Sequence, residues 1–161
     1  MSATGKSTLI LDLLSQGYKA IDLDTSAFSI WVDAEVDPVF PNNEVKPGKD
    51  WIWNENRVYE LLAIQDTEVL FVSGCASNMS KFYPNFDYKI LLTAPESTIV
   101  QRLKSRESTQ YGHLPEEVNR ILTLRQTIEP LLRRIADLVI DTSIPHQSTS
   151  ELILEYIRMN K

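Results

Sequence analysis

The run Ser2-Ala3-Thr4-Gly5-Lys6-Ser7-Thr8 decides the fold of this chain. It matches the last part of the pattern G-x-x-x-x-G-K-[ST], whose backbone N–H groups surround the phosphates of a nucleoside triphosphate. In that pattern the lysine reaches the outer phosphates and the next hydroxyl binds Mg²⁺. We therefore predict a phosphate-binding loop for ATP and Mg²⁺, with Lys6 in catalysis and Ser7 on the metal. The predicted cofactor contacts within it are Ala3, Thr4, Gly5, Lys6, Ser7 and Thr8.

A helical pattern follows this run directly. The apolar residues Leu9, Ile10, Leu13 and Leu14 recur at helical spacing, and Gly17 is a suitable stop. The loop therefore lies at the N-terminus of a helix, where free N–H groups and the helix dipole favour an anion. The alternative is an N-terminal tail ahead of a surface helix.

The front of the pattern lies outside the sequence. Its first glycine would fall one position before Met1, and no strand leads into the loop. We expect the natural protein to start upstream, with Met1 as an internal residue of a loop that is truncated here.

Composition limits the function classes. A chain of 161 residues, 43% hydrophobic and 24% charged, suits one globular domain spanning residues 1–161. The net charge of −6 argues against a nucleic-acid partner. A single cysteine, Cys75, allows no internal disulfide, which fits a reducing cytoplasm. No signal peptide or membrane-spanning stretch is visible, so we expect a cytoplasmic protein away from membranes.

Short β-rich runs alternate with helical runs, which predicts an α/β fold with a parallel sheet. A proline-rich, tryptophan-rich stretch, 25–53, is predicted as an irregular excursion on the substrate side. Its tryptophans would either line a pocket or cover the core. The polar stretch 105–114 is predicted as a short lid. Expected strands are 19–23, 69–73, 88–93 and 138–141, and expected helices are 7–16, 56–65, 95–106, 115–135 and 149–159.

Two carboxylates end the strand expected at 19–23. Asp22 and Asp24 are two positions apart, so they point to one face, at the carboxyl end where open α/β sheets bind ligands. We predict that Asp22 holds Mg²⁺ and that Asp24 accepts a hydrogen bond from the attacking hydroxyl. The alternative is that both only cap the strand.

One glycine and two pairs of residues are further candidates for ligand contacts. Gly74 would let the backbone approach a ligand closely. Arg102 and Arg106 share a helix face, where Arg106 would reach the transferring phosphoryl group and Arg102 would stack on a base. The alternative is that both arginines lie on a solvent-exposed helix face and contact no ligand. Arg57 and Glu60 also share a face, and either contact substrate or pair with each other.

Together these residues resemble the phosphate-loop small-molecule kinases, the group that includes shikimate, gluconate and adenylate kinases. The resemblance covers essentially the whole chain. Ile128 departs from it, because these kinases place an arginine there, and the single glycine of the 74–78 turn argues against shikimate itself as the acceptor. The matching motifs are Asp22-x-Asp24, Arg57-x-x-Glu60, Gly74, Arg102-x-x-x-Arg106 and Asp141-Thr142-Ser143.

The resemblance implies a three-layer α/β sandwich with strand order 2-3-1-4-5, in which strand 1 is absent from this chain. Its absence would leave either a gap or direct contact between 69–73 and 88–93. The resemblance also implies that Asp141 and Thr142 lie near the adenine, that Arg102 contacts the nucleotide, and that Asp24, Arg57 and Gly74 contact the acceptor.

The function predicted from the sequence is transfer of the γ-phosphoryl group of ATP to a small metabolite or nucleotide. Lys6, Arg106 and Mg²⁺ would neutralise developing charge. Two alternatives are an ATP-binding protein without useful catalysis, either regulatory or truncated, and a nucleoside triphosphatase. The second would usually have an acidic residue at the end of 69–73, where Ser73 stands.

Overall fold

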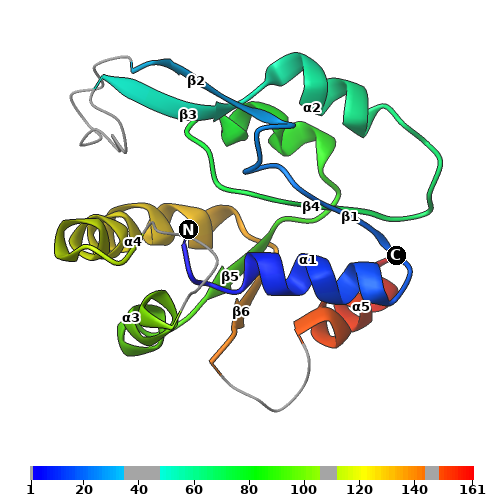
Figure 1. Cartoon of the computed structure of the whole chain (residues 1–161). Coiled ribbons are helices and arrows are strands. Elements are labelled where there is room, and N and C mark those ends of the chain that lie inside the picture. Colours follow the sequence, from blue (N-terminus) through cyan, green and yellow to red (C-terminus); the bar gives the residue numbers. More distant parts are fainter. Residues whose placement is uncertain (1, 35–47, 106–111, 144–148) are drawn as a thin grey trace.

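The structure, a computed structural model, describes residues 2–34, 48–105, 112–143 and 149–161 (Figure 1). Helices and parallel strands alternate along it, as the sequence pattern predicts for an α/β fold. The elements in order are α1 (Lys6–Ser15), β1 (Lys19–Asp22), β2 (Ser29–Asp33), β3 (Lys49–Trp53), α2 (Glu55–Leu62), β4 (Leu70–Ser73), a 3₁₀ helix η1 (Met79–Asn85), β5 (Ile90–Thr93), α3 (Glu96–Lys104), α4 (Pro115–Ile135), β6 (Leu138–Asp141) and α5 (Thr149–Asn160).

The four predicted strands form two parallel pairs. β1 pairs with β4, with Ala20 opposite Phe71, and β5 pairs with β6, with Leu92 opposite Ile140. In the described residues the two pairs remain separate sheets. Of the two arrangements left open by the sequence, the structure therefore has the gap between β4 and β5.

The prediction that 25–53 is irregular is wrong at both ends of that stretch. β2 and β3 form an antiparallel ribbon in which Trp31 lies opposite Trp51, with ring centroids 4.9 Å apart. Such cross-strand aromatic pairs stabilise a ribbon and outweigh the turn-forming residues nearby. Pro38 and Pro41, which suggested irregular backbone, lie outside the described residues.

Helices cover both faces of the β1–β4 pair. Side chains alternate along a strand, so Ala20 and Phe71 pack toward α1 while Ile21 and Val72 pack toward α2 and η1. In Figure 1, α2 lies at the top of the molecule with the β2–β3 ribbon, and α1 lies below β1 and β4. The arrangement is a helix–sheet–helix sandwich.

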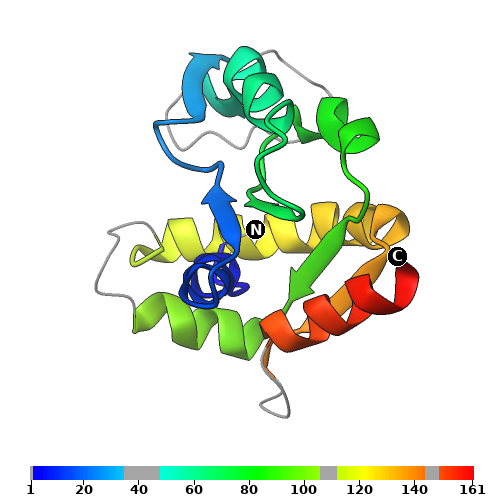
Figure 2. The same cartoon turned by 90° about the vertical axis from the view of Figure 1, so that its right-hand side faces the viewer.

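The β5–β6 pair is covered in the same way. Leu92 and Ile140 pack on α5, while Thr93 hydrogen-bonds to Glu129 of α4 from the opposite face. Figure 2 shows β5 between α4 and α5. Among the described residues, no helix is long and apolar enough to cross a membrane.

Candidate phosphate-binding and catalytic site

The phosphate loop precedes α1, which begins at Lys6. Two of its residues are in the left-handed region, Ala3 with φ of 59° and Gly5 with φ of 97°. Left-handed residues within such a loop turn successive N–H groups to one side, and this makes a concave site for an anion. The positive end of the α1 dipole adds to that preference. The loop and helix therefore fit a phosphate group on local geometry.

Arg102 and Thr142 hold this loop in place. The Arg102 guanidinium donates to Ala3 O at 3.1 Å, to Thr142 Oγ1 at 2.8 Å and to Thr142 O at 2.7 Å. Thr142 Oγ1 lies 3.1 Å from Thr4 O, and a Cβ on Gly5 would meet Thr142 at 3.6 Å. Arg102 and Thr142, which lie 40 residues apart in the sequence, were both predicted to contact the nucleotide. In the structure both contact the backbone of the loop.

Asp24 lies at the meeting point of three segments. Its carboxylate accepts from Cys75 N at 2.9 and 3.1 Å and from Trp53 Nε1 at 3.3 Å. Lys6 Nζ is 3.9 Å from Asp24 Oδ2, and both side chains are partly exposed, 21% and 28%. The structure therefore brings together the two residues predicted to act on the phosphoryl group and on its acceptor.

Gly74 permits the close approach of these segments. A Cβ at this position would lie 2.7 Å from Trp53 Cζ2 and 2.8 Å from Asp24 Oδ1, so only glycine fits. Trp53 itself is buried and packs on Phe82. Trp53 therefore belongs to the core, one of the two alternatives predicted for the tryptophans, and its indole N–H also orients the Asp24 carboxylate.

Asp22 accepts a hydrogen bond from Asp24 N at 3.0 Å, through Oδ1. Part of its role is thus the strand cap that the sequence offered as an alternative. Ser7 is exposed in the first turn of α1, as is Thr8. Among the described residues, no group of three or more His, Cys, Asp or Glu side chains is placed to hold a metal.

Arg57 does not pair with Glu60 among the described residues. Its guanidinium donates to Ala27 O at 2.8 Å and to Ser26 O at 3.4 Å, which fixes the segment between Asp24 and β2.

Arg106 and most of the predicted lid lie outside the described residues, which resume at Gly112. Glu117 accepts from Gly112 N at 2.8 Å at the start of α4.

Asp141 is the last residue of β6 and lies beside the phosphate loop. Hydrogen bonds from the Ser143 hydroxyl at 2.6 Å and the Ser143 N–H at 2.9 Å lower the pKa of Asp141, and the charges of Arg102 and Arg133 add to this. Each partner favours the ionised form of the carboxylate, and together they outweigh the opposing effect of burial.

We expect this pKa shift to appear as acid sensitivity. A folded-state pKa below the ordinary 3.8 means that the unfolded chain takes up the proton first, so stability is present above pH 3.8 and is lost as the pH falls below it. The Tm of the wild type should exceed that of Asp141→Asn by a constant amount above about pH 5, and the difference should shrink below it. Thermal denaturation from neutral to acidic pH measures this. A difference that is unchanged at low pH would contradict it.

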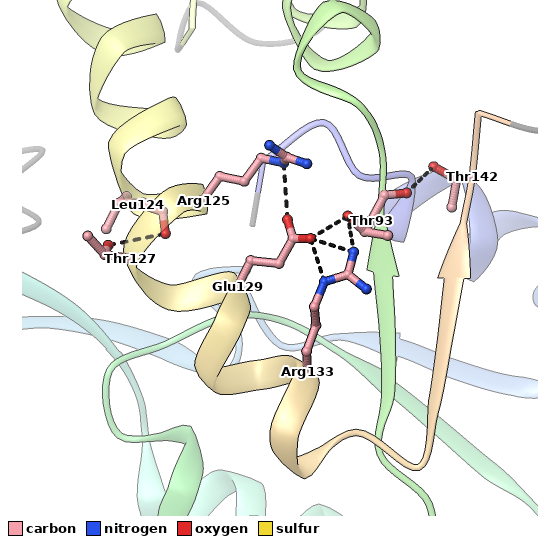
Figure 3. A network of polar contacts seen from close by, with 7 residues as sticks. All are labelled: Thr93, Leu124, Arg125, Thr127, Glu129, Arg133 and Thr142. Atoms are coloured by element: carbon pink, nitrogen blue, oxygen red, sulfur yellow. Dashed lines mark hydrogen bonds and ion pairs between the residues drawn. The ribbon is translucent and has the colours of Figure 1, made fainter.

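A buried carboxylate in α4 was not among the predicted site residues. Glu129 is 5% exposed, and its Oε1 accepts from Thr93 Oγ1 at 2.9 Å and from Arg133 at 2.7 and 2.9 Å (Figure 3). Arg125 Nε lies 3.0 Å from the other oxygen. The sequence does carry a signal, because Glu129 has an arginine four residues away on each side.

Glu129 connects to the phosphate loop through Thr93. The Thr93 carbonyl accepts from Thr142 N at 2.9 Å, and Thr142 in turn contacts Thr4 O. Figure 3 shows this chain of contacts from α4 through the end of β5 to Thr142. The network therefore supports the strand ends behind the loop.

Comparison with solved structures finds the same fold. A structure of shikimate kinase from Acinetobacter baumannii in complex with shikimate superposes with a TM-score of 0.62. The match covers 99% of this chain and 90% of that chain, at 17% sequence identity. No model of a known protein family matches the chain, and neither does any curated protein sequence. The chain therefore has an α/β fold like that of a phosphate-loop kinase.

Proposed function

We propose that this protein is an ATP-dependent kinase that transfers the γ-phosphoryl group to a hydroxyl of a small metabolite. The observation that carries the proposal is the contact of Lys6 with Asp24, 3.9 Å apart beside the phosphate loop. A phosphoryl-transfer enzyme needs a cation on the transferring group and a carboxylate beside the acceptor. The likeness in fold to a shikimate kinase structure supports the same class.

The residues have separate roles in this proposal. The N–H groups of the loop and the start of α1 bind the phosphates, and Lys6 stabilises charge on the transferring group. Asp24, oriented by Cys75 N–H and Trp53 Nε1–H, accepts a hydrogen bond from the attacking hydroxyl. Arg102 and Thr142 keep the loop in its binding shape.

Ser7 and Asp22 fit Mg²⁺ by the chemistry of their donors, a hydroxyl and a carboxylate. Mg²⁺ is commonly held by one or two such oxygens together with the substrate phosphates, so a larger cluster of acidic residues is not required. When bound, the ion neutralises charge on the phosphate oxygens. Asp22 accepts from Asp24 N through Oδ1, and in this proposal its carboxylate would hold the ion together with Ser7.

The nucleotide part of the proposal is tested with Lys6→Ala. We expect Mg·ATP to bind the wild type and the affinity to fall at least about tenfold in Lys6→Ala, because the variant loses the cation on the outer phosphates. Isothermal titration calorimetry measures both. Lys19→Ala is the matched control, since Lys19 pairs with Asp66 on the surface. Equal affinity in Lys6→Ala would refute this use of the loop.

The acceptor is sought by a thermal-shift screen of small metabolites in the presence of Mg²⁺ and a non-hydrolysable ATP analogue. A metabolite that raises Tm only with the analogue present is the expected result. Hydrolysis of ATP that no metabolite stimulates would instead favour a nucleoside triphosphatase. Binding of ATP without turnover would favour a regulatory protein.

A further inference from the structure

The ribbon of β2 and β3 is attached to the candidate site at its root. Trp53, the last residue of β3, donates from Nε1 to Asp24 at 3.3 Å. Ser29, which lies opposite Trp53 in β2, is buried and donates from its hydroxyl to Leu23 O at 2.6 Å. The side chains of two directly opposed residues project to the same face of a ribbon. One face of the ribbon therefore meets the strand end that carries Asp24.

Trp31 and Trp51 continue this face away from Asp24. Each lies two positions from the root pair, so its side chain projects to the same side, about 7 Å further along the strand. Trp31 is 37% exposed, and its ring is tilted by 53° against that of Trp51. Rings at this angle leave part of their faces uncovered by each other. We call Trp31, Trp51 and Trp53 the aromatic strip.

One turn fixes the aromatic strip relative to Asp24. The side-chain amide of Asn78 accepts from Trp53 N at 3.0 Å and donates to Trp53 O at 2.9 Å. In the same turn, Cys75 N donates to the Asp24 carboxylate at 2.9 Å. In Figure 1 the ribbon extends toward the side of the molecule on which the phosphate loop and α4 lie. The strip and the carboxylate are therefore pre-organised, which lowers the entropic cost of binding a ligand that contacts both.

The charges around the aromatic strip favour a neutral ligand. Lys49 and Asp33, the next opposed pair on this face, form an ion pair with each other. Lys49 is the cation among the ribbon residues 29–33 and 49–53, so its charge is already compensated. Asp24, at the other end of the strip, would repel an anionic group. A carboxylate or phosphate bound along the strip would therefore lie between two carboxylates without a compensating cation from these ribbon residues.

We propose that the aromatic strip binds a ring of the phosphoryl acceptor and that this acceptor is a nucleoside. A nucleoside is neutral and carries a planar base, and every base has a π face that stacks on aromatic side chains. With its hydroxyl at Asp24 and its base on Trp31 and Trp51, its sugar would span the distance of about 7 Å along the strip. This inference rests on the proposed kinase function and adds to it the class of the acceptor.

The reaction is then the conversion of a nucleoside and ATP to a nucleoside monophosphate and ADP. The hydroxyl oxygen of the sugar forms a bond to the γ-phosphorus while the bond from that phosphorus to the β–γ bridging oxygen breaks. The hydroxyl proton passes to Asp24, and ADP leaves with the electron pair of the broken bond. Trp31 and Trp51 position the nucleoside, and Trp53 orients Asp24.

Isothermal titration calorimetry with adenosine, guanosine, cytidine and thymidine tests the proposal, in the presence of Mg²⁺ and a non-hydrolysable ATP analogue. We expect at least one nucleoside to bind, and we expect no measurable binding of ribose, which has no base. In Trp31→Thr the affinity for that nucleoside should fall about 5- to 150-fold, the effect of losing one base–aromatic contact. Trp31→Phe keeps an aromatic face and should restore most of the affinity.

Ile30→Thr is the matched control. Ile30 is also 37% exposed and precedes Trp31 in β2, but its side chain projects to the opposite face. Threonine suits a strand at either position, so both variants introduce the same residue into the ribbon. The nucleoside affinity of Ile30→Thr should stay at the wild-type value, and so should the affinity of Trp31→Thr for Mg·ATP.

Three results would overturn this inference. If Mg·ATP binds and none of the nucleosides does, the kinase proposal stands and the acceptor class is wrong. Equal nucleoside affinity in Trp31→Thr and the wild type would exclude the aromatic strip as the binding site. Equal losses in Trp31→Thr and Ile30→Thr that Trp31→Phe does not restore would assign Trp31 to ribbon stability alone. Failure of Mg·ATP to bind the wild type would instead refute the proposed function on which the inference rests.

Discussion

Asp24→Asn should lower phosphoryl transfer by about 10²–10⁴, the usual effect of losing a positioned general base. The amide oxygen can replace Oδ1 and still accept from Cys75 N and Trp53 Nε1. The amide nitrogen replaces Oδ2, the atom 3.9 Å from Lys6, and can no longer accept a proton from the acceptor hydroxyl. The change therefore removes the chemistry and the 3.1 Å hydrogen bond from Cys75 N to Oδ2, while the two hydrogen bonds to Oδ1 persist.

Steady-state kinetics with the acceptor found by thermal shift measure this effect. ATP affinity should stay close to wild type, because Asp24 contacts the acceptor and not the triphosphate in this proposal. Asp66→Asn is the matched control, since Asp66 pairs with Lys19 at the surface and should leave turnover unchanged. If Asp24→Asn turned over normally, Asp24 would be a structural residue of the strand end.

The local features of this fold were predictable because short-range physics determines them. Periodic apolar residues and the Gly-Lys-Ser run are enough to predict α1 and the loop, and the alternation at 19–23 predicts β1. The β2–β3 ribbon was missed because its pairing joins Trp31 to Trp51 across a stretch rich in turn-forming residues. Cross-strand pairs of this kind depend on partners that no local window contains.

The candidate site likewise has features that the sequence predicts and contacts that only the fold reveals. The sequence brings Asp22 and Asp24 to one strand end, but the contact of Asp24 with Cys75 spans 51 residues and requires the fold. The contacts of Arg102 with Ala3 and Thr142 join segments far apart in the sequence and likewise require the fold. Spacing on a helix specifies which residues share a face, and it does not specify what that face meets.

Glu129→Gln should have the largest effect on stability among single changes in the candidate site. Removing one member of a fully buried ion pair costs about 3–5 kcal/mol, because the remaining charge loses its partner. Here Arg125 and Arg133 are 25% and 46% exposed, so water can solvate them in part. We therefore expect a loss of about 2–3 kcal/mol in the free energy of unfolding. Urea denaturation measures it.

Glu68→Gln is the matched control, since Glu68 is 83% exposed and pairs with Lys161, and it should cost less than about 1 kcal/mol. Equal costs for the two variants would show that Glu129 adds nothing beyond a surface pair. The triple variant Arg125→Met, Glu129→Leu, Arg133→Met separates stability from positioning, because replacing a whole buried network by apolar residues is often neutral. If it regains stability but binds ATP more weakly than the wild type, the network acts by holding Thr93 and, through it, Thr142 against the loop. If ATP binding returns with stability, Glu129 only stabilises the fold.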